Sequence, residues 1–175
     1  MRFKHHDRGF TWVELMISLA VAAILLTLAI PNFQQDLIKK EVQSSQLKLS
    51  RAIQMARQTA MTQANHVVIC ASQTKNSCTA QSWSQGFLVF IDINNNRKVD
   101  SNEQIIWAET LALKYGQLKW GSLNNNNLSF IPRSGLPLGS NGTFSYCAHQ
   151  SQFSYSLVVS QMGHNRIDRT QRCDS

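Results

Sequence analysis

Three arginines, spaced by three residues, give the C-terminal end of the chain its clearest chemistry. They are Arg166, Arg169 and Arg172. A guanidinium group pairs with phosphate through parallel hydrogen bonds, so these arginines can contact successive phosphates of a nucleic acid backbone. Contacts to phosphates do not read the base sequence. His164 would add a positive charge when it is protonated at low pH. The tail therefore predicts sequence-independent binding of double-stranded DNA, and the alternative is a set of solvated charges on a basic protein.

Four cysteines, Cys70, Cys78, Cys147 and Cys173, allow three disulfide connectivities. An even number of cysteines in a small exported domain indicates disulfides. We favour Cys70–Cys78, which closes a short loop, and Cys147–Cys173, which ties the C-terminus to a strand. Free buried thiols are the alternative, and a zinc site is disfavoured because the chain has no Cys-x-x-Cys pair. The favoured pairing would hold the arginine tail on the domain.

Residues 92–103 have the spacing of a calcium-binding EF-hand loop. The candidate ligands are Asp92, Asn94, Asn96, Asp100 and Glu103, with Lys98 supplying a backbone carbonyl. However, Arg97 replaces the glycine of the sharp turn, and the charges of Arg97 and Lys98 cancel two of the three carboxylates. The alternative is a polar loop whose side chains cap their own backbone. We favour that loop and expect no bound metal.

Enzyme signatures are absent from the sequence. It contains no Gly-x-Ser-x-Gly, no phosphate-binding P-loop and no His-Glu-x-x-His. The five histidines show no ligand spacing except the adjacent His5 and His6. We therefore expect no catalytic activity and no cofactor.

An apolar run covers residues 10–30 and contains one charged residue, Glu14. At 1.5 Å per residue it is about 31 Å long as a helix, enough to cross a bilayer. The preceding segment carries Arg2, Lys4 and Arg8, which the positive-inside rule keeps in the cytoplasm. Residues 10–31 are thus predicted to be a single membrane span, with the rest of the chain exported.

Helical spacing continues from 32 to 65, where the chain has no Gly or Pro. Its apolar stripe is Ile38, Val42, Leu49, Ile53, Ala56, Ala60 and Ala64. We expect one helix of about 55 residues, loosened at Pro31 by the missing backbone bond. Beyond it, alternating patterns predict strands at 66–72, 86–92, 104–109, 127–132, 142–148 and 155–160. The predicted fold is α+β, with the helix on antiparallel strands of a 66–175 globular domain.

Composition agrees with a folded, basic chain. The 175 residues are 43% hydrophobic and 9% aromatic, which excludes a disordered protein. The net charge is +7. A basic domain attracts DNA, but it also attracts anionic lipid and polysaccharide, so charge alone does not choose the partner.

The stretch Gly9-Phe10-Thr11-Trp12-Val13-Glu14, followed by apolar residues to Pro31, resembles the N-terminus of type IV pilins and pseudopilins. The family usually has Leu at the position of Trp12. Further segments resemble the FimT/GspH branch of minor pilins: 52–64, 67–70 with Cys78, 83–92, 128–130 and 157–160.

The resemblance implies a defined processing route. A prepilin peptidase would remove the leader, residues 1–9, by cutting between Gly9 and Phe10, and Phe10 would be N-methylated. The protein would wait in the inner membrane, with its globular domain in the periplasm, and then join other pilins in a helical filament. Glu14 would pair with the free amine of a neighbouring Phe10, because a carboxylate in an apolar span needs a partner; the alternative is a solvated Glu14 at the interface.

FimT-type proteins of natural transformation carry a similar Gly-Arg-x-Arg tail and bind DNA with it. Gly163 and Arg166 fit this motif, whereas His164 stands where the first arginine would be. The resemblance therefore implies a minor pilin that captures extracellular DNA for uptake. The alternative is a structural minor pilin, or a GspH-like pseudopilin of type II secretion, that primes filament assembly.

Overall fold

The computed structural model describes residues 11–122, 126–169 and 173, without the side chains of 28–32. The chain divides into two compact units, Met1–Leu37 and Ile38–Ser175. Helix α1 (Trp12–Gln63) has 52 residues, and its helical assignment includes Pro31. The single long helix expected from the sequence is thus present.

The first unit holds the N-terminal part of α1. Its large apolar side chains are exposed within the chain, for example Trp12 at 73% and Leu19 at 61%. Across the residues that the structure describes, no helix is both long enough and apolar enough to cross a membrane. The predicted span 10–31 lies partly outside those residues.

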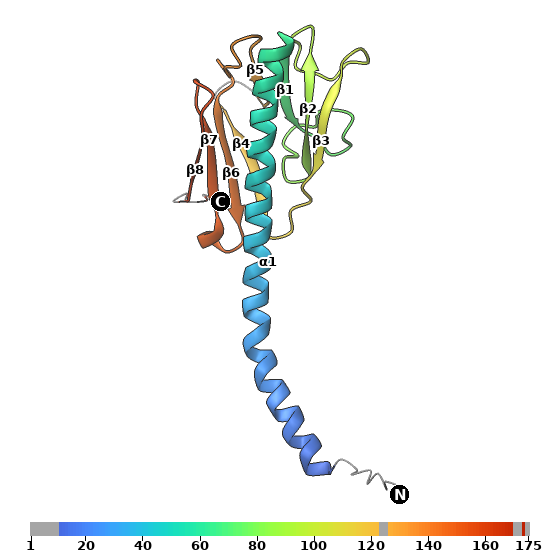
Figure 1. The fold of residues 1–175 in the computed structure, drawn as a ribbon, viewed down its shortest axis with the longest axis vertical. Coiled ribbons are helices and arrows are strands. Elements are labelled where there is room, and N and C mark those ends of the chain that lie inside the picture. Colours follow the sequence, from blue (N-terminus) through green and yellow to red (C-terminus); the bar gives the residue numbers. More distant parts are fainter. Residues whose placement is uncertain (1–10, 123–125, 170–172, 174–175) are drawn as a thin grey trace, which may run out of the picture. The chain divides into compact units, whose positions relative to one another are not determined.

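Within the described residues of the second unit, eight strands form two sheets (Figure 1). Sheet A has the order β3 (Ile105–Thr110), β2 (Gly86–Asp92), β1 (His66–Ala71) and β5 (Leu128–Phe130). Sheet B has the order β4 (Gly116–Gly121), β6 (Gly142–Ala148), β7 (Tyr155–Val159) and β8 (Asn165–Asp168). A short 3-10 helix, η1 (Ser151–Phe153), joins β6 to β7. Every strand pair is antiparallel, so the predicted α+β fold is confirmed, whereas β4 and β8 are strands that the sequence patterns did not predict.

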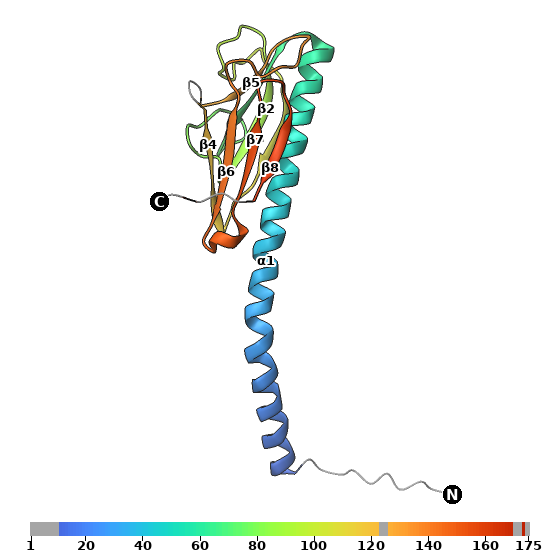
Figure 2. The same cartoon turned by 90° about the vertical axis from the view of Figure 1, so that its left-hand side faces the viewer.

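The core of the second unit lies between α1 and the two sheets. The predicted stripe supplies the helix side, with Leu49, Ile53, Ala56 and Ala60 all buried, while the exposed Ala64 follows the helix with a φ of 53°. Both sheets add to the same cluster, among others through Val67, Val89, Phe144 and Leu157. The view turned by 90° shows both sheets on one side of the Ile38–Gln63 part of α1 (Figure 2).

The outer faces of the two sheets differ in character. Sheet A is apolar there, because Val68, Leu88 and Phe90 form a second buried cluster against Cys78 and Val99 of its loops. Sheet B carries polar side chains on its outer face, among them the paired Lys119 and Ser145. Loops therefore cover the outer face of sheet A, whereas polar side chains such as Lys119 are exposed on that of sheet B.

Candidate functional site

Arg166 lies in β8, the edge strand of sheet B, and is exposed. It pairs with Val158 of β7, and paired residues share a face of a sheet. The neighbours of Val158, Leu157 and Val159, are buried in the core. Because successive side chains of a strand point to opposite faces, Val158 and Arg166 face away from the core.

Arg169 lies on the other side of the same strand. It follows β8 directly and lines a cavity of about 350 Å³ with Lys39 and Gln43 of α1 and with Tyr155 of β7. A spacing of three along an alternating strand places residues on opposite faces. The predicted succession of arginines therefore does not form on one face at Arg166 and Arg169. Arg172 lies outside the described residues.

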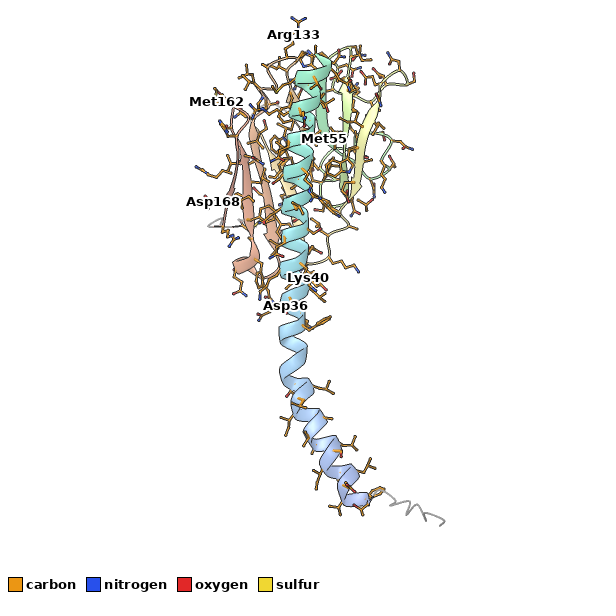
Figure 3. All side chains as sticks on the ribbon, viewed as in Figure 1. Asp36, Lys40, Met55, Arg133, Met162 and Asp168 are labelled. Carbon is orange, nitrogen blue, oxygen red and sulfur yellow. A yellow bond between two sulfur atoms is a disulfide. The ribbon has the colours of Figure 1, made fainter. Side chains whose placement is uncertain are left out.

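His164 precedes β8 and is exposed. Its backbone carbonyl accepts a hydrogen bond of 2.9 Å from the N–H of Ser160, which extends the pairing of β7 with β8. Its own N–H donates to the Ser160 hydroxyl at 3.2 Å. By the alternation of the hairpin, His164 lies on the same side as Arg166. Figure 3 shows Met162 at this turn and Asp168 at the far end of β8.

Gly163 fits the turn for two reasons. Its φ is +74°, a conformation that other residues adopt only with strain. A Cβ atom there would also lie 3.2 Å from the guanidinium of Arg57. Arg57 Nη1 donates a hydrogen bond of 3.2 Å to the Gly163 carbonyl, so α1 holds the turn that precedes Arg166. Sequence reasoning missed Arg57, because no local pattern connects residues that are 106 positions apart.

The disulfide Cys147–Cys173 attaches the chain end to β6, with a Cα–Cα distance of 5.7 Å. Cys147 follows the buried Tyr146 in β6, so it belongs to the outer face of sheet B. The second disulfide joins Cys70 to Cys78, as the spacing predicted. The C-terminus is therefore tied to the face on which Arg166 lies.

Glu41 of α1 fixes the start of sheet B on the helix. Its carboxylate accepts hydrogen bonds from the N–H groups of Lys114 at 2.8 Å and Tyr115 at 3.1 Å, and from the Tyr146 hydroxyl at 2.7 Å. Burial, together with this bond and the negative charge of Glu41, raises the pKa of Tyr146 far above its ordinary value. These contacts hold the beginning of β4 and Tyr146 of β6 against the helix.

The candidate calcium loop binds its own backbone. Asp92 is fully buried, and its carboxylate accepts the N–H groups of Asn96 at 3.1 Å and Arg97 at 2.8 Å. Glu103 accepts the N–H groups of Ile93 and Asp100, at 2.9 and 3.1 Å.

Asp100 accepts the side-chain amides of Asn94 and Asn96, both at 2.7 Å. Arg97 has a φ of 58°, the conformation that the glycine of an EF-hand would take. Within the described part of the chain, no three His, Cys, Asp or Glu side chains gather as a metal site.

Of the predicted processing residues, Gly9 and Phe10 lie outside the described residues. Glu14 lies in the first turn of α1, where its N–H donates to the Thr11 hydroxyl at 3.3 Å and its carboxylate accepts from that hydroxyl at 3.5 Å. The first of these bonds makes Thr11 the N-cap of the helix, because its hydroxyl accepts a backbone N–H of the first turn.

Comparison with known proteins gives two family matches. Residues 47–163 match the family described as "Type II transport protein GspH". Residues 4–30 match the "Prokaryotic N-terminal methylation motif".

Individual proteins agree with these matches. Over 173 residues the chain is 26% identical to "Pilin-like protein PilA1" of Thermus thermophilus, and the match covers 92% of this chain and 98% of that protein. The type IV minor pilin FimU of Pseudomonas aeruginosa has a similar fold in two crystal forms, at 20% identity in both. The TM-scores are 0.57 and 0.53, with 74% and 72% of this chain and 89% and 91% of FimU covered.

Proposed function

Because this chain belongs to the GspH family of type IV minor pilins and pseudopilins, we propose that it is a minor pilin that binds double-stranded DNA for uptake in natural transformation. The observation that carries the DNA-binding part is the position of Arg166. It is exposed on an edge strand, and the disulfide Cys147–Cys173 attaches the chain end to the same face. Arginines held in this way need little ordering when they meet phosphates.

Assembly follows the route of the family. Residues 1–9 act as a leader, a prepilin peptidase cuts between Gly9 and Phe10, and residues 10–31 anchor the mature chain in the inner membrane before it joins other pilins. The methylation motif over 4–30 supports this route. The exposed apolar side chains of Trp12 and Leu19 need lipid or neighbouring helices around them.

In the filament, Glu14 pairs with the amine of a neighbouring Phe10. A Glu14→Gln variant should then be made and processed normally but be missing from sheared filaments. Filaments containing the variant at the wild-type level would rule out the pairing.

A second function rests on the family description itself. The match to a type II transport protein favours a pseudopilin or structural minor pilin that helps to begin a filament. Deleting the gene would then abolish piliation or secretion as a whole, whereas loss of a DNA-capture pilin would spare filaments and abolish transformation.

The direct test titrates fluorescent double-stranded DNA with the full chain in non-ionic detergent, both disulfides intact, at several salt concentrations. Each phosphate contact makes the slope of log K against log salt more negative by about 0.9, so binding through phosphates should weaken steadily as salt rises. The Arg166→Gln, Arg169→Gln, Arg172→Gln triple variant should lose this binding. A matched triple at exposed cations elsewhere, Lys75→Gln, Lys98→Gln and Arg133→Gln, should keep it. If the wild-type chain binds no DNA at low salt, or if both triple variants lose affinity for DNA equally, the DNA-binding role is wrong and the structural role is favoured.

A further inference from the structure

We infer that DNA lies against the outer face of sheet B beside the attached chain end, with Lys119 as a phosphate contact at the edge opposite Arg166. This inference rests on the proposed DNA-binding function and extends it from the tail to a sheet surface. Five residues mark this surface: Gln117, Lys119, Thr143, Ser145 and Arg166.

Strand register places these residues together. One row across the sheet runs from Lys119 to Ser145, then to Ser156 and Asp168. The next row runs from Thr143 to Val158 and Arg166. Residues paired in this way share one face of the sheet.

The buried neighbours identify this face as the outer one. Each of the strands β4, β6 and β7 has a core residue next to a member of the two rows. These core residues are Leu118, Phe144 and Leu157, and all three are fully or almost fully buried. Lys119 and Gln117 are exposed. The rows therefore point away from α1. Except for Val158 their side chains are polar, and except for Ser156, which is buried, they are at least partly exposed, whereas the outer face of sheet A is apolar.

The chemistry of the surface suits a phosphate backbone. Hydroxyl, amide and cationic side chains are the groups that contact DNA phosphates without reading bases. Asp168 is the only carboxylate in the four strands of sheet B, all of which the structure describes. Lys119 and Arg166 thus give the surface a cation at each edge.

The width of the sheet also fits a duplex. Strands β4 and β8 are three strand spacings apart, which is roughly 14 Å. A major groove is about 12 Å wide, so cations on the two edges can reach phosphates on both of its walls. The disulfide at Cys147 attaches the C-terminus between these edges, on β6.

The test compares Lys119→Gln with Lys98→Gln in the full chain, by DNA titration at several salt concentrations. Both substitutions remove one exposed positive charge, and Lys98 lies in the loop after β2 of sheet A. Lys119→Gln should weaken binding about threefold to tenfold and make the salt slope shallower by about 0.9. Lys98→Gln should change neither.

A second pair of variants tests the surface without removing a cation. Thr143→Glu places a carboxylate between the two edges and should weaken DNA binding more than Thr74→Glu, which lies in an exposed loop of sheet A. Near-ultraviolet circular dichroism and the unfolding midpoint identify any variant that fails to fold.

The two proposals fail in different ways. If the wild-type chain binds no DNA, the proposed function falls and this surface falls with it. If the wild type binds and the tail triple variant does not, but Lys119→Gln and Thr143→Glu bind like their controls, DNA contact is confined to the tail and the sheet surface is wrong.

Discussion

The guanidinium of Arg57 donates a hydrogen bond to the carbonyl oxygen of Gly163, 106 residues later in the chain. Arg57 belongs to α1, whereas Gly163 belongs to the turn between β7 and β8. This contact connects the helix to the turn that precedes His164 and Arg166. The position of the proposed DNA contacts thus depends in part on Arg57, a helix residue outside the proposed DNA surface.

Replacing Arg57 should loosen this turn. Arg57→Ala removes the hydrogen bond and the packing of its half-buried side chain, which should lower the free energy of unfolding by about 1–2 kcal/mol. DNA binding should weaken, because Arg166 is then held less firmly. Urea unfolding and DNA titration measure the two effects. Arg51→Ala, at an exposed position earlier in α1, should change neither, and equal effects of both variants would contradict a role for the turn contact.

Gly163 allows conformational strain to be separated from crowding. Gly163→Ala must adopt a φ of +74° and also place a Cβ atom 3.2 Å from the Arg57 guanidinium. Gly139→Ala is the matched control, since its φ is +72° but nothing lies within 4 Å of the added atom. Strain alone costs about 1–2 kcal/mol, so Gly163→Ala should be the more destabilising of the two in urea unfolding. If both variants lose the same free energy of unfolding, the Arg57 side chain moves away from the added Cβ atom at no measurable cost.

The helix and most strands follow from local sequence, because their periods are visible in it. Leu49, Ile53, Ala56 and Ala60 have helical spacing, and all four are buried. Strand β8 gives no such signal, since Ile167 is its one aliphatic residue and is itself 45% exposed at the sheet edge. Strand β4 begins and ends with glycine, and polar and apolar residues alternate over only the four residues between them. This stretch is too short for its alternation to predict a strand.

The candidate site is harder to predict than the fold. Cysteine count and spacing favour the pairing Cys147–Cys173 among three connectivities, and the structure confirms it. The face on which each arginine side chain lies cannot be predicted in this way, because it depends on whether the tail forms a strand. Once β8 pairs with β7, Arg166 faces outward and Arg169 lines a cavity with α1. Lys119 becomes relevant only through the register of four strands, which no local pattern contains.

Glu41 should contribute measurably to stability. Its carboxylate accepts three hydrogen bonds, two of them from backbone N–H groups at the start of β4. Glu41→Gln presents an amide donor to groups that are themselves donors, so the free energy of unfolding should fall by about 1–3 kcal/mol. Glu109→Gln is the control, because it removes only the partly exposed ion pair with Lys48, which is worth about 1 kcal/mol or less. A smaller loss for Glu41→Gln than for Glu109→Gln would contradict this assignment.

Stability should fall in alkali because of Tyr146. Burial and the Glu41 carboxylate raise the pKa of its hydroxyl above the ordinary value of 10.0. Burial also raises the pKa of Tyr155. Between the ordinary pKa and the raised one, the unfolded chain has lost protons that the folded chain keeps, so rising pH favours unfolding.

The unfolding midpoint should therefore be unaffected by these two groups below a pH of about 10 and should decline above it. Tyr146→Phe removes one of the two groups, so its midpoint should decline less steeply between pH 9 and 11. Midpoints measured by circular dichroism at closely spaced pH values test this. A decline of the same steepness in Tyr146→Phe would mean that another group controls alkaline unfolding.

The two disulfides should differ in what they do for DNA binding. Cys147 and Cys173 are 26 positions apart in the sequence. Removing a cross-link over such a loop costs about 3–4 kcal/mol when its effect is the entropy of the unfolded chain. Replacing both cysteines by serine should also weaken DNA binding, because the end of the tail is no longer attached to sheet B. Replacing Cys70 and Cys78 by serine, which opens a loop of sheet A with a separation of 8, should lower stability but leave the affinity for DNA and its salt slope unchanged. If the Cys147–Cys173 variant binds DNA as tightly as the wild type at a temperature where both are folded, attachment of the tail is not what makes the arginines effective.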